Sequence, residues 1–210
     1  MDNTDQYILN HIDKEPDLLA QINRQAHVKL LHPGMVSGHL QGRLLKMLVQ
    51  MIRPQQVLEI GTHTGYSALC MAEGLSEEAH LHTIEIDDEM EDYIKDNFAK
   101  TPLSDKITLH IGDAGKIVPE FGNNFFDLVF IDADKRNYWR LFESVYPKLK
   151  KEGFIIVDNT LWYGKVIEEV ESNDWQTKGI VEFNAKLAGD PRVEKVILPV
   201  RDGLTLIRKK

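Results

Sequence analysis

After Pro54 the chain alternates between short apolar runs and longer stretches with helical spacing, and this alternation constrains the fold most strongly. Near-continuous apolar runs that are each followed by a helix are typical of a parallel sheet covered on both faces. The predicted strands are residues 56–60, 80–84, 107–111, 126–131 and 154–157. The predicted helices that follow them are residues 67–74, 88–100, 114–121, 135–150 and 176–188.

Both ends of the chain depart from this pattern. Residues 1–53 are predicted to form a helical extension, with one helix over 38–52. Residues 193–199 and 204–208 flank Arg201-Asp202-Gly203, which predicts an antiparallel hairpin. We therefore expect an α/β fold, a doubly wound, mostly parallel seven-stranded sheet closed by a C-terminal hairpin. Residues 1–210 form one domain in this interpretation, with residues 54–210 as its binding core.

The composition limits the partners and the compartment. The chain has 25 Lys+Arg against 33 Asp+Glu, a formal charge of −8, which argues against a protein held mainly on nucleic-acid phosphates or anionic lipid. The single cysteine excludes an intramolecular disulfide and a cysteine metal site. The N-terminus is unlike a signal peptide, and no apolar run approaches the roughly 20 residues that span a bilayer. We expect a soluble, cytoplasmic protein without a DNA or membrane partner.

The segment 57–67 predicts a strand, a glycine turn and a helix start. Gly61 and Gly65 allow the backbone to approach a ligand closely, and the helix start directs free N–H groups to the same place. Glu85, at the end of the next strand, suits hydrogen bonds to both hydroxyls of a ribose. A tight turn without a ligand would show the same glycines, but the two features together favour an adenosine-containing ligand.

The spacing around these glycines indicates which ligand. The sequence reads Glu59-x-Gly61-x-x-x-Gly65, whereas the dinucleotide fingerprint is G-x-G-x-x-G. Glu59 is a poor neighbour for a pyrophosphate and suits an amine-bearing ligand. We therefore favour S-adenosylmethionine over NAD, and an NAD-dependent oxidoreductase is the disfavoured alternative. Asp113 and Ala114, after the third strand, are expected near the adenine.

Polar residues also follow two neighbouring strands, with Asp132 after 126–131 and Asp158 and Asn159 after 154–157. Adjacent strands lie about 4.8 Å apart, so these side chains can converge. Two carboxylates and an amide oxygen suit Mg²⁺, Mn²⁺ or Ca²⁺ rather than zinc. The alternative is that they are turn formers and a helix cap. Lys135 follows closely enough to act on a metal-bound substrate.

At these residues the sequence resembles the cation-dependent O-methyltransferases, the family of catechol and caffeoyl-CoA O-methyltransferases. The anchors of the resemblance are the segments 38–42, 58–62, 65–67, 127–135 and 157–164. It implies a Rossmann-like class I methyltransferase fold. It also implies that Asp132, Asp158 and Asn159 hold the cation, with Mg²⁺ foremost, and that Lys135 is catalytic.

The resemblance extends to the rest of the pocket. The segment Asp-Ala-Asp-Lys at 132–135 resembles the plant and bacterial branch, in which the N-terminal helices contribute to substrate choice and dimerisation. A homodimer is therefore expected. The residues expected to line the S-adenosylmethionine pocket are Glu59, Gly61, His63, Gly65, Ser67, Glu85, Asp113, Ala114 and Asp132. Those expected to line the substrate are Met35, Ser37, Trp162 and Tyr163.

The mechanism that follows is a hypothesis about a small aromatic diol. Its vicinal oxygens chelate the cation, which lowers the pKa of the hydroxyl. Lys135 removes the proton as a general base, and the oxygen attacks the sulfonium methyl in line. Methylation of a hydroxylated tRNA base is a rival with the same chemistry. The acidic charge counts against it, although five basic residues are a candidate RNA patch: Lys46, Arg53, Lys135, Arg136 and Arg140.

Two histidines alternate on one face of a predicted strand, His80 and His82. With no third ligand expected nearby, we interpret them as strand-surface residues rather than as a metal pair.

Overall fold

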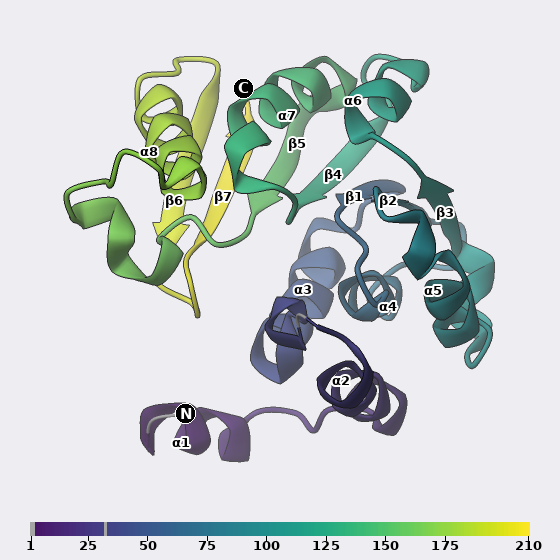
Figure 1. Cartoon of the computed structure of the whole chain (residues 1–210). Coiled ribbons are helices and arrows are strands. Elements are labelled where there is room, and N and C mark those ends of the chain that lie inside the picture. Colours follow the sequence, from purple (N-terminus) through teal and green to yellow (C-terminus); the bar gives the residue numbers. More distant parts are fainter. Residues whose placement is uncertain (1–2, 32) are drawn as a thin grey trace.

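The computed structural model describes residues 3–31 and 33–210 and contains one sheet of seven strands (Figure 1). The strand order is β3-β2-β1-β4-β5-β7-β6. The parallel strands are β1 (Gln56–Ile60), β2 (His80–Glu85), β3 (Ile107–Ile111), β4 (Phe126–Ile131) and β5 (Leu149–Val157). The hairpin consists of β6 (Val193–Leu198) and β7 (Leu204–Lys209), and β7 runs antiparallel to both β5 and β6. The predicted doubly wound, mostly parallel seven-stranded sheet is confirmed.

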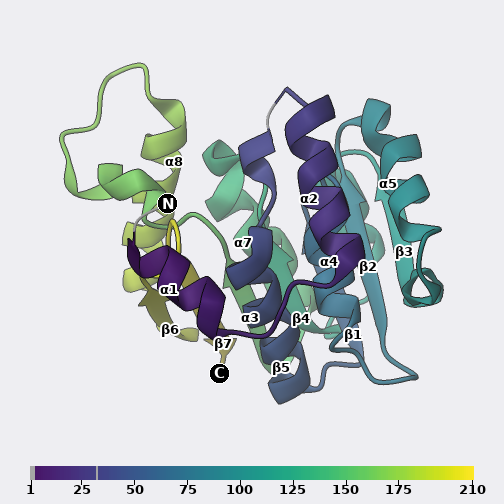
Figure 2. The ribbon, with the colours of Figure 1, turned by 90° about the horizontal axis from the view of Figure 1, so that it is seen from below.

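Helices cover both faces of the sheet (Figures 1 and 2). One face carries α2 (Asp17–Lys29), α3 (Gly38–Ile52), α4 (Tyr66–Ala72) and α5 (Glu91–Phe98). The other carries α6 (Ala114–Ile117), α7 (Tyr138–Val145) and α8 (Trp175–Ala188). Successive strand residues point to opposite faces. Leu128 and Phe130 accordingly pack with the first set of helices, and Val129 and Ile131 with the second. The central strand β4 is therefore apolar on both sides over most of its length, because both sides are covered.

The N-terminal extension has two parts. In α2 and α3 the apolar stripe is buried in the core, through Leu19, Ile22, Leu45 and Val49 among others. By contrast α1 (Asn3–His11) buries no residue and lies farther from the sheet than the other helices (Figures 1 and 2). Among the helices of the described residues, none has both the length and the apolar character that crossing a bilayer requires.

Short 3₁₀ segments complete the chain: η1 (Pro33–Met35), η2 (Asp88–Met90), η3 (Pro102–Lys106), η4 (Val118–Glu120), η5 (Lys135–Asn137), η6 (Tyr146–Lys148) and η7 (Trp162–Ile167).

One stretch differs from the expectation of a single helix over residues 135–150. It is divided into η5, α7 and η6, and β5 already begins at Leu149 rather than at residue 154. Pro147, which cannot continue a helix interior, follows the end of α7. The exposed charged residues Lys151 and Glu152 interrupt the apolar run and conceal the first half of the strand.

Candidate functional site

Most of the predicted cofactor and metal residues follow the carboxyl ends of β1, β2, β4 and β5, which lie next to one another in the order β2-β1-β4-β5. The turns after these strands are tied to the neighbouring strand ends. Backbone N–H groups of Gly61, Asp132 and Asp158 donate to the carbonyls of Ile84, Ile60 and Ile131 at 2.9, 2.9 and 3.0 Å. The strand order reverses between β1 and β4, and open α/β sheets bind their ligands at such a switch point.

The glycines of the first turn are required by the packing of the protein itself. Gly61 has φ +101°, and a Cβ there would lie 1.8 Å from the carbonyl oxygen of Asp132. Gly65 has φ +80°, and a Cβ there would lie 2.5 Å from the ring of Phe98. The fold therefore needs both glycines whether or not a ligand binds. Gly61 allows the turn after β1 to pack directly against the backbone of Asp132.

Glu85 is buried against this glycine turn. Its Oε2 accepts a hydrogen bond from the backbone N–H of His63 at 2.6 Å, and its Oε1 accepts one from Asp87 at 2.9 Å. His63 itself adopts a left-handed backbone with φ 50°. An ionised carboxylate has about four lone-pair positions, so Glu85 keeps acceptor capacity for further donors.

Glu59 lies at the same place and is fully buried. Its carboxylate accepts hydrogen bonds from Ser67 Oγ at 2.6 Å and Thr83 Oγ1 at 2.5 Å. Burial raises the pKa of Glu59 to about 8, and the nearby carboxylates of Asp132 and Glu85 add to this, whereas the two hydroxyls oppose it. A cation close to Glu59 would favour its ionised form.

The turn after β3 joins this edge of the sheet. The N–H of Gly112 donates to the carbonyl of Glu85 at 2.7 Å. Asp113 is exposed and caps α6, because its Oδ1 accepts the N–H of Gly115 at 2.8 Å, while Ala114 is buried. The carboxylate of Asp113 thus has a local structural partner of its own.

A second group combines two carboxylates and an amine. Lys135 is buried, and its Nζ donates to Asp132 Oδ1 at 2.6 Å. Burial raises the pKa of Asp158 to about 6, and the Asp132 charge adds to this, while hydrogen bonds from Gln41 and the Asn159 backbone oppose it. The structure therefore brings Asp132, Asp158 and Lys135 into one electrostatic cluster.

Asn159 begins a tightly held loop. Its N–H donates to Asp158 Oδ1 at 2.7 Å, its side chain lies near the carboxylate of Asp202, and its φ is 57°. The hairpin tip holds the rest of the loop, because Thr160 N–H donates to the Gly203 carbonyl at 3.0 Å and Leu161 N–H to that of Asp202 at 2.9 Å.

These donors fit a hard divalent cation. Among the described residues no three His, Cys, Asp or Glu side chains form a metal-binding group. Asp132 and Asp158 supply two carboxylates; burial raises the pKa of Asp158 most, and repulsion from the Asp132 charge raises it further. A dication would remove that repulsion, and the amide of Asn159 would be the third oxygen ligand.

The four residues expected to line the substrate differ in burial and in their distance from Lys135. The ring of Trp162 lies 5.8 Å from Lys135 Nζ, and that of Tyr138 lies 5.2 Å from it. Ser37 is buried, and its carbonyl accepts a hydrogen bond from Arg201. Tyr163 and Met35 lie at the surface, 78% and 57% exposed. The structure thus places the Trp162 ring close to Lys135 and leaves the side chains of Tyr163 and Met35 open to solvent.

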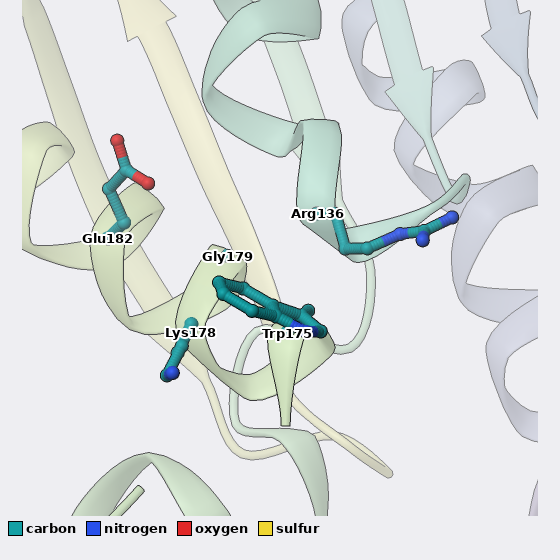
Figure 3. Close-up of a pocket in the computed structure, with 5 residues that line it drawn as sticks. All are labelled: Arg136, Trp175, Lys178, Gly179 and Glu182. Atoms are coloured by element: carbon teal, nitrogen blue, oxygen red, sulfur yellow. The ribbon is translucent and has the colours of Figure 1, made fainter. Parts of the chain in front are cut away.

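An open pocket of about 520 Å³ lies beside the start of α8 (Figure 3). The Nζ of Lys178 is 4.4 Å from the centroid of the Trp175 indole. The described lining residues include none of those predicted for cofactor, metal or substrate: Arg136, Trp175, Lys178, Gly179 and Glu182.

The sequence reasoning did not assign a role to Gln41, Tyr138 or Asp202. The hydroxyl of Tyr138 donates to the backbone carbonyl of Asp158 at 3.0 Å. Gln41 donates to the Asp158 carboxylate, and Asp202 contacts Asn159. The only signal for Gln41 was its position inside the motif 38–42, since a buried polar residue on an otherwise apolar helix face requires a partner.

A third histidine, His110, lies near His80 and His82, although no three His, Cys, Asp or Glu side chains in the described part of the chain form a group that could hold a metal ion. His82 Nδ1 lies 3.1 Å from His110 Nε2, because β3 pairs with β2 and places His110 diagonally across from it. His80 hydrogen-bonds Thr108 Oγ1 at 2.8 Å. We call His80, His82 and His110 the histidine cluster; its members are half-buried.

The comparisons with known proteins agree with this architecture. The O-methyltransferase family model matches residues 10–210. The caffeoyl-CoA O-methyltransferase of Eucalyptus gunnii is 31% identical, over 97% of this chain and 86% of its own.

Two solved structures superpose over almost the whole chain. An O-methyltransferase of Bacillus cereus in complex with SAH has a TM-score of 0.90, 30% identity and coverage of 99% of this chain and 97% of its own. The O-methyltransferase TomG of Streptomyces achromogenes in complex with SAM has a TM-score of 0.90, 27% identity and coverage of 100% and 96%. The chain therefore belongs to the O-methyltransferase family, and we identify it as an S-adenosylmethionine-dependent O-methyltransferase.

Proposed function

We propose that this enzyme uses a divalent cation, Mg²⁺ foremost, to methylate one hydroxyl of a small aromatic molecule with two vicinal hydroxyls. The observation that carries the proposal is the cluster at the ends of β4 and β5. There Lys135 Nζ contacts the Asp132 carboxylate, whose charge acts on the buried Asp158 next to Asn159. All the donors that would hold the cation are oxygens, which suits Mg²⁺, Mn²⁺ or Ca²⁺.

The cofactor would lie along the ends of β1 and β2. Glu85 has acceptor capacity for the two ribose hydroxyls. The α-ammonium of S-adenosylmethionine would lie near Glu59 and Ser67, where a positive charge offsets the burial of the carboxylate. The glycine turn, His63, Asp113 and Ala114 complete the proposed pocket. The relatives solved with SAM or SAH support the choice of this cofactor.

Methyl transfer needs the acceptor hydroxyl to lose its proton. The cation, when bound, would lower the pKa of a hydroxyl that it contacts. Lys135 in its neutral form accepts the proton at Nζ, and the rings of Tyr138 and Trp162 shield this amine from water. The acceptor oxygen then forms a bond to the methyl carbon as the carbon–sulfur bond breaks, which leaves S-adenosylhomocysteine.

The names of the relatives indicate a second form of the acceptor. Caffeoyl-CoA carries the vicinal diol on an aromatic ring that is joined to coenzyme A as a thioester. A free catechol and a thioester of this kind present the same reacting group, so we include both in the proposed substrate class.

The test is transfer of labelled methyl from S-adenosylmethionine to catechols and to hydroxycinnamoyl thioesters, with Mg²⁺ and with EDTA. We expect labelled product only with the metal. Equal labelling in EDTA would contradict the metal requirement. Labelling of bulk tRNA, but of neither diol class, would replace the proposed acceptor with a hydroxylated base.

We also propose that the enzyme is a homodimer. Apolar side chains are exposed on α2 and α3, including Val28, Met47 and Met51, and a second copy of the chain would cover them. Light scattering at micromolar concentration measures this directly, and a monomer mass would contradict it.

A further inference from the structure

A buried hydrogen-bond chain connects α3 to the acidic cluster. Gln41, on α3, is 1% exposed, and its Nε2 donates to Asp158 Oδ2 at 2.6 Å. Its Oε1 accepts a hydrogen bond from Arg201 Nη1 at 3.1 Å. Arg201 lies in the turn of the β6–β7 hairpin, so three segments far apart in the sequence meet at one amide.

The orientation of the Gln41 amide is determined by its two neighbours. A guanidinium only donates hydrogen bonds, so Arg201 attracts the amide oxygen. An ionised carboxylate only accepts them, so Asp158 attracts the amide nitrogen. If either Arg201 or Asp158 were removed, the hydrogen bond to the other would still favour the observed orientation of the amide. With both present, the opposite orientation would lose two buried hydrogen bonds.

The Asp158 carboxylate is in turn held at both oxygens. Oδ2 accepts from Gln41, and Oδ1 accepts from the Asn159 backbone at 2.7 Å. The Tyr138 hydroxyl holds the Asp158 carbonyl at 3.0 Å. The carboxylate plane is therefore fixed, and the remaining lone pairs of both oxygens have a defined direction.

Arg201 is itself anchored. Its guanidinium donates to the backbone carbonyl of Ser37, and Nη2 donates to that of Val36 at 3.4 Å. The next residue, Asp202, accepts the N–H of Leu161 at its carbonyl and contacts the side chain of Asn159. The hairpin tip thus joins the start of α3 to the loop that begins with Asn159.

We propose that Gln41 is a positioning residue, which holds the Asp158 carboxylate in the orientation that a divalent cation requires, and that Arg201 acts through Gln41 by fixing its amide. This inference rests on the proposed metal-dependent function. Hydrogen-bond partners of metal ligands orient those ligands, and their loss typically weakens metal binding about 10–100-fold.

The test is Mn²⁺ binding, titrated by the loss of the free-ion electron paramagnetic resonance signal in the presence of saturating SAH. Gln41→Met keeps the side-chain volume and removes both hydrogen bonds, and we expect about 10–100-fold weaker Mn²⁺ binding. Arg201→Met should weaken binding less, and Arg201→Lys, which keeps a donor, should restore most of it. In the Gln41→Met background, Arg201→Met should change the Mn²⁺ affinity no further.

Gln50→Met is the matched control, because Gln50 is an exposed residue of the same helix. SAH affinity from calorimetry and the melting temperature show whether each variant is folded. If Gln41→Met does not fold, the Mn²⁺ affinities of Arg201→Met and Arg201→Lys are compared instead, because both variants keep the buried amide of Gln41.

Three results would overturn the inference. If the wild type binds Mn²⁺ and folded Gln41→Met binds it within twofold, Gln41 does not position Asp158 and the proposed metal-dependent function is unaffected. If the effects of Arg201→Met and Gln41→Met are additive, Arg201 does not act through Gln41. Failure of the wild type to bind Mn²⁺ at all would overturn the metal-dependent function and this inference with it.

Discussion

The sheet carries two clusters of ionisable side chains, and burial shifts the pKa values of the two clusters in opposite directions. At the strand ends, burial raises the pKa of Glu59 to about 8 and of Asp158 to about 6. In the histidine cluster, burial lowers the pKa of His82 to about 4, and His80 and His110 add to this. Both shifts favour the neutral form, as desolvation always does.

The difference lies in what each cluster lacks. The histidines are satisfied when neutral, because His82 and His110 share a hydrogen bond and the ring of Phe121 packs against both. The carboxylates at the strand ends repel one another, and a cation would relieve this repulsion. At the strand ends Lys135 forms an ion pair with one carboxylate, Asp132, so the negative charges there are only partly compensated.

Removal of a proposed metal ligand should have the largest effect. Asp158→Ala is expected to lower metal-dependent methyl transfer by at least about 10³-fold, because the cation would lose one of its two carboxylates. SAH binding should persist, since most of the residues proposed to bind the cofactor lie at the ends of β1 and β2 and in the turn and helix start after β1. Labelled-methyl transfer and calorimetry with SAH measure the two. His82→Asn, in the other cluster, is the control and should keep its turnover; unchanged turnover in Asp158→Ala would remove Asp158 from the site.

Replacement of the proposed general base should have the next largest effect. Lys135→Met is expected to lower kcat by about 10²–10⁴-fold with little change in the affinity for Mn²⁺ or SAH. Lys135→Arg separates the two roles of this side chain, because a guanidinium keeps the charge but does not deprotonate in proteins. If Lys135→Arg retained wild-type kcat, Lys135 would contribute its charge and not proton transfer.

Glu59→Gln should change cofactor affinity and stability in opposite directions. Its carboxylate pKa is about 8 in the folded protein and 4.5 ordinarily, so its burial costs stability increasingly as the pH rises from about 4.5 through 8. Glutamine carries no charge and can hydrogen-bond both Ser67 and Thr83. The ligand-free variant should therefore melt higher than the wild type at pH 8 and equally at pH 4.5.

The same substitution should weaken S-adenosylmethionine about tenfold, the effect of a lost charge-assisted hydrogen bond. Melting curves at the two pH values and calorimetry measure the two effects. If Glu59→Gln bound the cofactor with wild-type affinity, the proposed contact between Glu59 and the ammonium of S-adenosylmethionine would be contradicted.

The sequence predicts the strand ends well because each signal is local. A near-continuous apolar run indicates a covered strand, and the polar residue that ends it, such as Glu85 or Asp132, must lie at the carboxyl edge of the sheet. Asp158 and Asn159 directly follow the apolar run 154–157, so the sequence places them at the same edge of the sheet. These features depend only on neighbours in the chain.

The support around the strand ends depends on tertiary contacts instead. Asp158 and Arg201 both hydrogen-bond the Gln41 amide, although the three residues come from separate segments, and no local pattern pairs them. The contact of His82 with His110 depends on register, because Thr108 is the direct partner of His82 and His110 lies two residues farther along β3. A sequence pattern indicates which face a residue occupies but not its diagonal neighbour in the next strand.

This contact gives the smallest of the expected effects. The pKa of His82 is about 4 in the folded protein, below its ordinary value of 6.5, so the unfolded chain takes up the proton first as the pH falls. The stability that neutral His82 retains above pH 6.5 should be lost progressively down to about pH 4. Because His82 is half-buried, we expect this loss to be only about 1 kcal/mol of unfolding free energy, or about 2–4 °C in melting temperature. His82→Asn should reduce the difference in melting temperature between pH 7.5 and pH 4.5 by that amount. An unchanged difference would show that the histidine cluster takes up protons in the folded state as readily as in the unfolded chain, and the comparison of the two clusters would then depend on the carboxylates alone.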